Sequence, residues 1–181
     1  MQRRQFLFVV SSAVVILTAR ASASAASGDD KVTIKQFSDD GKPLGRVSLL
    51  KVRKDAEWRK VLSPLAYQVT REKGTERAFS VPGYNRHEAG VYRCVCCDNA
   101  LFDGSTKYDS ATGWPSFWQP IAPENVRNIV DQQLGMTRTE VQCTLCDAHL
   151  GHVFDDGPKP TGLRYCMNTV AMRFVPKTKR N

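Results

Sequence analysis

The sequence predicts a mainly β protein, a small domain of antiparallel β-sheet preceded by two short helices. Three observations support this fold class. After Gly74 the hydrophobic segments are short, aromatic or β-branched, as in G-V-Y-R-C, S-F-W-Q-P and V-A-M-R-F-V. Glycine, proline, asparagine and aspartate separate them at close intervals, which is typical of strands joined by tight turns. The helical signals lie earlier in the chain, between residues 55 and 74.

The first residues have the pattern of an export signal. Arg3 and Arg4 precede a short apolar run, and small residues in A-x-A order follow it. Two adjacent arginines followed by Phe and Leu resemble a twin-arginine signal. A general secretory signal and an uncleaved anchor are the alternatives, although the apolar run is short for a membrane span. We therefore expect residues 1–26 to be a signal peptide and the protein to be periplasmic, or tethered to the membrane if the signal is kept.

The rest of the chain has the length of one domain with a single core. We divide it into an N-terminal extension at 27–52, the main domain at 53–176 and a basic tail at 177–181. Removal of the signal takes away three arginines and no acidic residue, so the formal net charge of +8 falls by three. The other basic residues are dispersed, so we expect no nucleic-acid partner. We expect a monomer.

The first elements of the fold follow from local patterns. Alternating residues on either side of D-D-G-K-P-L-G predict a loosely packed hairpin over 32–52, at the edge of the domain. Asp55 is expected to cap a short helix that runs to Leu62. The dipeptide Ser63-Pro64 is expected to start a second helix ending near Gly74, because serine is a favoured helix cap and proline fits the first helical turn.

All six cysteines follow the signal, and four of them form two Cys-x-x-Cys pairs: Cys94/Cys97 and Cys143/Cys146. An exported chain with an even number of cysteines would by default suggest disulfides. The two-residue gap instead lets both thiolates of one turn face the same metal ion, and four cysteines leave no open position on it. The sequence therefore favours one structural Zn²⁺ that joins two distant hairpins, with disulfides as the alternative.

Two further groups lie close to these pairs. Cys96 adds a third thiol to C-V-C-C, but the two-residue gap favours Cys94 and Cys97 as ligands. His149 follows the second pair and could replace a ligand. Because four well-spaced thiols are present, we expect the imidazole of His149 to be free for other chemistry.

Cys166 stands alone in L-R-Y-C-M-N, which we expect to be a strand. A lone cysteine is often a small buried hydrophobic residue. However, His149 and His152 could exchange protons with it, and Arg164 and Asn168 lie near it in the sequence, which is typical of a nucleophilic thiolate. The residues themselves leave both interpretations open.

The run G-W-P-S-F-W at 113–118 gathers aromatic side chains beside a turn that proline fixes. Packing in the core is the simpler interpretation, and we prefer it for Phe117. A rigid aromatic wall on a loop would equally suit an apolar ligand group such as a thioether methyl.

Three long runs resemble a known family: C-V-C-C-D-N-A-L-F, K-Y-D-S-A-T-G-W-P-S-F and R-T-E-V-Q-C-T-L-C-D-A-H-L-G-H-V-F-D-D-G-P-K-P-T-G-L-R-Y-C-M-N. They resemble the B-type peptide-methionine (R)-S-oxide reductases over most of 57–174. The resemblance implies a β-rich domain with a four-cysteine zinc. It also implies an enzyme that reduces the R epimer of methionine sulfoxide, free or in proteins, and so repairs oxidised proteins. Its electrons would come from a thioredoxin-like or other thiol donor.

The same resemblance implies the catalytic roles. Cys166 would attack the sulfoxide sulfur, methionine would leave, and the cysteine would become a sulfenic acid. His149, His152 and Asn168 match the residues that bind and protonate the sulfoxide oxygen.

The resemblance also implies the pocket and the metal site. Trp114 matches the residue that packs on the substrate methyl group, and Phe154 and Arg164 are expected in the pocket wall because they flank the histidines and the thiol. The matched zinc ligands are Cys94, Cys97, Cys143 and Cys146.

One departure from the family affects turnover. Many members have a resolving cysteine at the position of Thr112, so a disulfide between Cys166 and that loop is impossible here. We predict that an external thiol reduces the sulfenic acid directly, with a route through Cys96 as the alternative.

Two other functions are consistent with parts of the pattern. One is a zinc-ribbon-like binding module in which Cys166 and the histidines are structural, and which would keep its behaviour in a Cys166→Ser variant. The other is a zinc hydrolase using His149 and His152, but it needs an open metal site and a carboxylate base at a recognisable spacing.

Overall fold

The computed structural model describes residues 30–52, 54–131 and 137–177. The expected signal peptide at 1–26 and residues 178–181 of the basic tail lie outside the described residues. Lys177, the first residue of that tail, forms an ion pair with Asp103 at 2.8 Å. Within the described ranges, no helix combines the length and the hydrophobicity that crossing a membrane requires.

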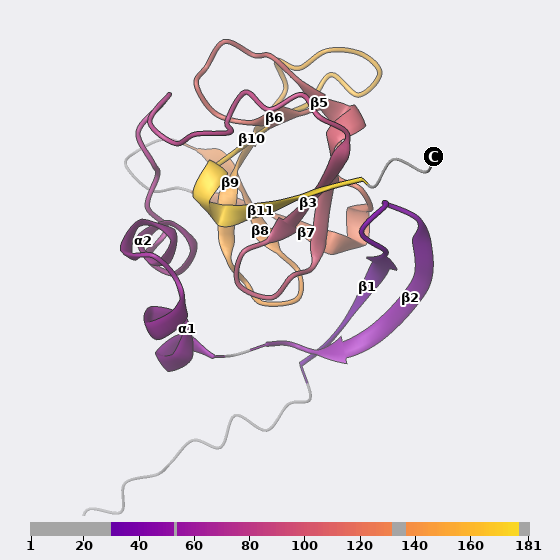
Figure 1. Ribbon diagram of the computed structural model, residues 1–181, viewed down its shortest axis with the longest axis vertical. Coiled ribbons are helices and arrows are strands. Elements are labelled where there is room, and N and C mark those ends of the chain that lie inside the picture. The colour runs from indigo at the N-terminus through magenta and orange to yellow at the C-terminus, as the bar shows by residue number, and fades with distance from the viewer. Residues whose placement is uncertain (1–29, 53, 132–136, 178–181) are drawn as a thin grey trace, which may run out of the picture.

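The fold is mainly β, as the sequence predicts, and its paired strands are antiparallel (Figure 1). A hairpin of β1 (Lys31–Phe37) and β2 (Pro43–Leu50) comes first, followed by α1 (Asp55–Val61) and α2 (Pro64–Glu72). A six-stranded sheet has the order β5 (Lys107–Tyr108), β6 (Ser116–Phe117), β10 (Arg164–Met167), β9 (His149–Phe154), β8 (Arg138–Cys143) and β7 (Val126–Asp131). A three-stranded sheet has the order β11 (Met172–Pro176), β3 (Gly90–Cys94) and β4 (Ala100–Asp103).

The two predicted helices are present, but only one has the predicted cap. Ser63 precedes α2, and its hydroxyl accepts a hydrogen bond from the Ala66 amide at 3.2 Å. The expectation that Asp55 caps α1 is wrong. Asp55 is the first helical residue, and its carboxylate accepts a hydrogen bond from Arg71 on α2 at 2.8 Å. The carboxylate therefore ties the two helices together instead of binding the free N–H groups of its own first turn.

The N-terminal hairpin is present, but it is not loosely packed as predicted. Ile34 is buried in the main core. The side chain of Asn125 pairs with the backbone of Lys35 in both directions, with its oxygen accepting from N–H and its nitrogen donating to C=O, each at 2.8 Å. These contacts join segments that are 90 residues apart in the sequence, so the local pattern could not reveal them.

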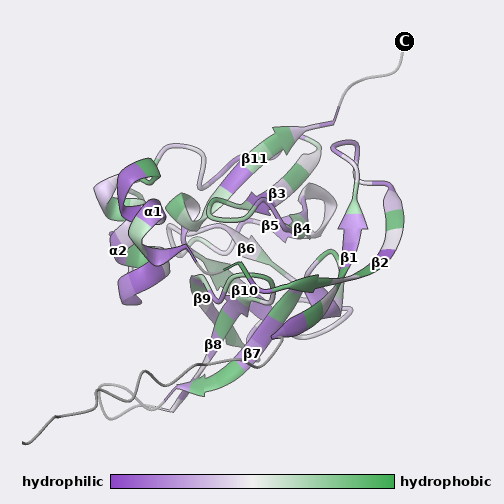
Figure 2. Ribbon diagram, turned by 90° about the horizontal axis from the view of Figure 1, so that it is seen from below, coloured by the Kyte–Doolittle hydropathy of each residue, from purple (hydrophilic) through white to green (hydrophobic). Residues whose placement is uncertain are grey.

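Aromatic side chains fill the space between the two larger sheets. Phe102 on β4 stacks on Phe117 on β6, with ring centroids 4.4 Å apart, and Tyr92 on β3 meets Phe117 edge-on at 4.9 Å. Phe117 is fully buried, so its predicted place in the core is confirmed. The helices cover one side of this β core and the hairpin lies on the other side (Figures 1 and 2). The core thus holds the six-stranded sheet, which carries Cys166, in a fixed position.

Candidate active site and metal site

The two Cys-x-x-Cys pairs lie in two turns of matching geometry. In the first turn, Asp98 adopts a left-handed conformation (φ 62°), and its N–H donates to the Cys94 carbonyl at 2.9 Å. In the second turn, Asp147 does the same (φ 57°) and donates to the Cys143 carbonyl, also at 2.9 Å. Each turn therefore folds both of its thiols toward one point, as the two-residue spacing predicts.

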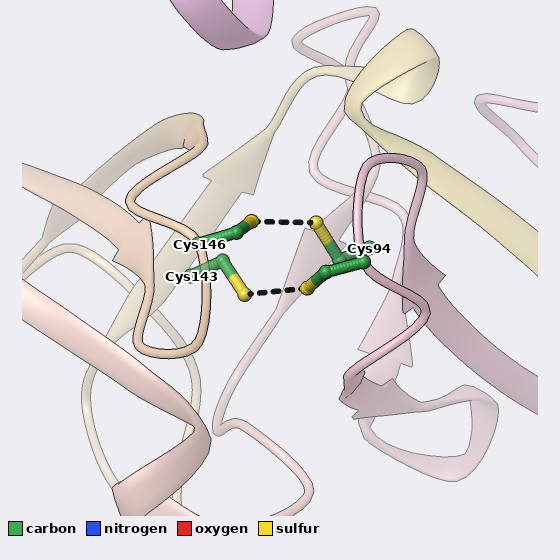
Figure 3. A group of neighbouring side chains, drawn as sticks. Cys94, Cys143 and Cys146 are labelled. Atoms are coloured by element: carbon green, nitrogen blue, oxygen red, sulfur yellow. Dashed lines mark hydrogen bonds between the residues drawn. The ribbon is translucent and has the colours of Figure 1, made fainter. Parts of the chain in front are cut away.

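The four thiols come together across these turns. The sulfurs of Cys94 and Cys146 are 3.6 Å apart, those of Cys97 and Cys143 are 3.5 Å apart, and all four lie within 4.8 Å of one another. In Figure 3 the side chains of the labelled Cys94, Cys143 and Cys146 point toward one another from the two turns. All six cysteines of the chain are free, so the disulfide alternative is wrong.

The donor set and its spacing fit a tetrahedral zinc ion. Four sulfurs placed about 2.3 Å from one ion would lie about 3.8 Å from each other, close to the observed sulfur–sulfur distances. The Asn99 side-chain N–H also points to the Cys143 sulfur at 3.6 Å, a contact that supports a thiolate ligand. His149 is not part of the cluster. The expectation that its imidazole is free for other chemistry is therefore consistent with the structure.

A second group of reactive side chains lies in one row across the six-stranded sheet. Cys166 on β10 is paired with His152 on β9 and with Ser116 on β6. His152 is in turn paired with Glu140 on β8. Directly opposed residues on neighbouring strands project from the same face of a sheet. The strand register therefore places the thiol between a hydroxyl and an imidazole.

An irregularity in β9 brings His149 to the same face. In a regular strand, residues three apart point to opposite faces. The β8–β9 register shifts between Val141 and Gln142. A bulge of this kind moves the side chains beyond it to the opposite face of the sheet. Consequently the rings of His149 and His152 meet, with centroids 5.4 Å apart.

Gly151, between the two histidines, allows β9 to approach β10 closely. Its φ of 156° is rare for residues with a side chain, and a Cβ atom there would lie 2.1 Å from the carbonyl oxygen of Cys166. Any other residue would force the two strands apart at the reactive thiol.

Each histidine is bound to a carboxylate through one ring nitrogen. Nδ1 of His149 lies 2.8 Å from Oε1 of Glu140, and Nε2 of His152 lies 3.2 Å from Oδ2 of Asp131. Glu140 also accepts a hydrogen bond from Lys73 at 2.8 Å. Each carboxylate favours the tautomer in which the nitrogen facing it carries the proton. Nε2 of His149 is buried and has no partner among the described residues.

The environment keeps both imidazoles neutral and the thiol protonated at neutral pH. Burial lowers the pKa of His149 and of His152 below the ordinary value, and the hydrogen bonds to the carboxylates only partly offset it. Burial raises the pKa of Cys166, against the opposing effects of Arg164 and of hydrogen bonds from Thr112 and Ser116. For Glu140, burial would raise the pKa, but the hydrogen bonds from neighbouring side chains outweigh it and the pKa is lowered.

A cavity of about 160 Å³ opens at the thiol. Its size suits one side chain, because pockets for drug-sized ligands begin near 300 Å³. The lining includes predicted site residues from three segments of the chain: Trp114, His152, Phe154, Cys166 and Asn168. The structure thus brings together the thiol, an imidazole, an amide and two aromatic rings that the sequence analysis singled out.

Two predicted site residues lie beside the cavity and not in its lining. Arg164 stacks its guanidinium on the ring of Phe154 at 4.5 Å and binds Asp156 through two hydrogen bonds of 2.8 Å. It therefore packs against one of the rings that line the cavity. His149 contacts the ring of His152, and its Nε2 atom is buried without a partner among the described residues.

Several residues that complete the site were not predicted from the sequence. Glu140 and Asp131 bind the histidines, and Glu76 binds Trp114 and Asn168 through its backbone. For Glu140 there was a weak signal: T-R-T-E-V-Q-C is another of the short segments after Gly74 that have the pattern of a strand, and a glutamate within a strand has to face either solvent or a polar partner. Nothing near Glu76 in the sequence indicated its contacts.

The four clustered cysteines and Cys166 therefore lie in two different environments. The four clustered thiols would fill every position of a tetrahedral ion, whereas Cys166 is not part of that cluster and lines a cavity. Such a division fits a β-sheet enzyme with a structural metal and a separate thiol available for chemistry. It does not match a zinc hydrolase, which needs an open position on its metal.

Comparison with known proteins identifies the family. The model of the SelR domain matches residues 62–176. A peptide methionine sulfoxide reductase MsrB from Hahella chejuensis is 56% identical over 125 residues, which are 68% of this chain and 90% of that protein. A chloroplastic peptide methionine sulfoxide reductase B1 from Arabidopsis thaliana is 58% identical over 119 residues, which are 65% of this chain and 58% of that protein. The chain belongs to the B-type methionine-R-sulfoxide reductase family and is a peptide methionine sulfoxide reductase.

Proposed function

We propose that the protein reduces the R epimer of methionine sulfoxide, free or within proteins, through a sulfenic acid on Cys166, and so repairs oxidised proteins. The observation that carries this proposal is the pairing of Cys166 with His152 on neighbouring strands, where both residues line a cavity sized for one side chain. The pairing supplies a nucleophile, a group that can move its proton, and room for one oxidised methionine.

The reaction balances without an added proton. Attack of Cys166 on the sulfoxide sulfur and transfer of the oxygen break the sulfur–oxygen bond of the substrate and form one on the cysteine. The substrate sulfur is reduced by two electrons and the Cys166 sulfur is oxidised by two. The thiol loses one proton and the oxygen gains one, so a neutral imidazole can accept the first and return it to the oxygen. His152 is the residue paired with Cys166, and the ring of His149 contacts the ring of His152.

The site can select one epimer because it fixes where the methyl group lies, where the oxygen lies and from which side the thiol attacks. The sulfur of methionine sulfoxide carries a methyl group, an oxygen and the rest of the side chain. Trp114 offers an apolar wall for the methyl, the amide of Asn168 and the imidazole of His152 offer polar partners for the oxygen, and Cys166 fixes the direction of attack. With these directions set, only one epimer leaves its side chain pointing out of the cavity. The family resemblance assigns this epimer as R.

The four-cysteine cluster would hold one structural zinc. The residues that would bind it are Cys94, Cys97, Cys143 and Cys146. Bound zinc would join the turn after β3 to the turn after β8 and so stabilise a small β domain. Cys166 is not part of the cluster, so the reaction itself uses the side chains of the cavity.

An external thiol, from a thioredoxin-like protein or a small molecule, would regenerate the enzyme. Two donor thiols would reduce the sulfenic acid to the thiol, releasing water and forming the donor disulfide. Thr112 occupies the place where a resolving thiol could stand, and its side chain is one of the neighbours that lower the pKa of Cys166. Cys96 faces α2 instead, with its sulfur 3.5 Å from the hydroxyl of Thr70. These different surroundings support direct reduction over a route through Cys96.

The proposal includes the location and the assembly state. Residues 1–26 would direct export by a twin-arginine route to the periplasm, with tethering to the membrane if the signal is kept. Export of the folded chain would let the zinc site load before the protein meets an oxidising compartment. The enzyme would act as a monomer, because one chain supplies the thiol, the histidines and the pocket.

A single-turnover experiment tests the function. The purified, reduced protein is mixed with the R or the S epimer of N-acetyl-methionine sulfoxide amide, without a reductant, and methionine and free thiols are counted. We expect one equivalent of product from the R epimer with the loss of one thiol, and no product from the S epimer. Cys166→Ser should abolish the burst, and the matched control Cys96→Ser should keep it. No burst with either epimer from folded protein would reject the proposal. Loss of two thiols would instead establish Cys96 as a resolver.

A further inference from the structure

Glu76 is a buried acidic residue that the proposed reaction does not use. It lies after α2 and is only 2% exposed. Its two carboxylate oxygens accept hydrogen bonds from the backbone N–H groups of Thr169 at 2.7 Å and Val170 at 2.9 Å. Burial of a carboxylate is costly unless strong hydrogen bonds compensate it, so this side chain is firmly held.

The backbone of the same residue binds two walls of the catalytic cavity. The indole N–H of Trp114 donates to the Glu76 carbonyl at 3.1 Å, and the Glu76 N–H donates to the side-chain oxygen of Asn168 at 3.0 Å. Both partners line the cavity at Cys166. The side-chain nitrogen of Asn168 donates one bond to the Leu150 carbonyl at 3.1 Å. With its oxygen occupied by Glu76, the Asn168 amide has one defined orientation.

The carboxylate and the backbone bonds form one connected unit. The carboxylate binds the chain directly after Asn168, while the backbone binds the Asn168 side chain and the Trp114 ring. Movement of Glu76 would therefore displace the apolar and the polar wall of the cavity together.

We propose that Glu76 is a positioning residue for the reaction, because it holds Trp114 and Asn168 in the reactive arrangement around Cys166. This inference rests on the proposed function. Glu76 does not line the cavity, so it acts through its two partners. The geometry also permits a purely structural role, the anchoring of the segment at 169–171, and the experiment separates the two.

The test is a single-turnover measurement on Glu76→Gln with the R epimer of N-acetyl-methionine sulfoxide amide. Glutamine can accept only one of the two backbone N–H groups, and its own NH₂ group faces the other. The burst amplitude reports the fraction of folded, active enzyme, and the rate constant reports the arrangement of the site. We expect a rate constant between about tenfold and 100-fold lower, as for small displacements of reacting groups, with the amplitude unchanged.

The control is Val91→Ala, which removes two methyl groups from a fully buried side chain on β3, outside the main core cluster. It should lower the unfolding temperature and leave the rate constant unchanged. A Glu76→Gln variant that behaves like Val91→Ala, with an unchanged rate constant, would overturn the inference. Because the wild-type protein is measured alongside, absence of any wild-type burst would reject the proposed function instead.

A second variant applies if Glu76→Gln does not fold. Trp114→Phe keeps an aromatic wall but deletes the N–H that binds the Glu76 carbonyl. We expect a rate constant at least about tenfold lower at unchanged amplitude. An unchanged rate constant would show that the bond to Glu76 does not position the ring, and would overturn the inference.

Discussion

Cys166 and His152 lie directly opposite each other on β10 and β9, and His152 in turn is bound to Asp131 at 3.2 Å. The imidazole nitrogen that faces the carboxylate carries a proton in the neutral ring. The other ring nitrogen is then available as a proton acceptor. The strand pairing thus places a proton acceptor beside a thiol whose burial keeps it protonated.

The first prediction is a broad bell-shaped pH profile. Burial holds the histidine pKa values below the ordinary 6.5 and the Cys166 pKa above 9.0. The neutral thiol and neutral imidazoles therefore dominate between these limits. We expect kcat/KM for the R epimer to be flat across neutral pH, to fall below 6.5 as the imidazoles gain protons, and to fall above 9.0 as the thiol proton is lost. A steep dependence centred near neutrality would contradict this assignment.

The second prediction concerns the carboxylate that binds His149. Its hydrogen bond raises the pKa of His149 against the effect of burial, so Glu140→Gln should lower that pKa further. The acid limb should move to lower pH, and kcat/KM should fall about tenfold because the imidazole becomes a weaker base. The pH profile of kcat/KM is the measurement.

Lys73→Met is the control, because it should shift the pKa of His149 in the opposite direction. The charge of Lys73 lowers the pKa of His149, so its removal should move the acid limb to higher pH. Shifts of the two variants in the same direction would reject the electrostatic explanation.

The third prediction distinguishes a cysteine that would bind structural zinc, Cys143, from one that would not, Cys96. Zinc binding in four-ligand peptide sites contributes on the order of 10–16 kcal/mol, as much as the whole stability of a typical domain. Cys143→Ser should therefore bind little zinc and unfold, whereas Cys96→Ser should keep one zinc per chain and its unfolding temperature. Elemental analysis and thermal circular dichroism measure both. Full stability of metal-free Cys143→Ser would argue against a structural metal.

The fourth prediction is that a substitution at Thr112 changes how the sulfenic acid on Cys166 is reduced. The side chain of Thr112 lowers the pKa of Cys166, which indicates that the two side chains are neighbours, so a thiol at this position could attack the sulfenic acid. Thr112→Cys should lose two thiols per turnover and form a disulfide between the introduced thiol and Cys166, detected by peptide mass mapping. Thr112→Ser is the matched control and should still lose one. A Thr112→Cys burst that consumes only one thiol would show that the loop cannot bring the two sulfurs together.

Much of the site could be read from local patterns. The two Cys-x-x-Cys pairs, the cap at Ser63 and the lone Cys166 are short-range features, and the structure bears out the paired thiols and the cap. The cap at Asp55 and the loose hairpin were wrong, because both depended on distant partners: Arg71 for the aspartate and Asn125 for the hairpin.

By itself the sequence determined which reactive groups the chain carries and how they are spaced. It supplied a closed set of four thiols, a separate thiol, two nearby imidazoles and no thiol at Thr112. These are properties of residue type and spacing, which need no knowledge of the fold.

Only the tertiary structure decided how those groups face one another. The register of β9 and β10 placed His152 opposite Cys166, and the irregularity between β8 and β9 turned His149 to the same face. Burial then set the protonation states, and Glu76 joined Trp114 to Asn168, residues that lie 38 and 92 positions from it in the sequence. Strand register and burial depend on how the whole core packs, because each strand must be paired in the register that buries its hydrophobic face against the rest of the core. A local stretch of sequence does not contain that information.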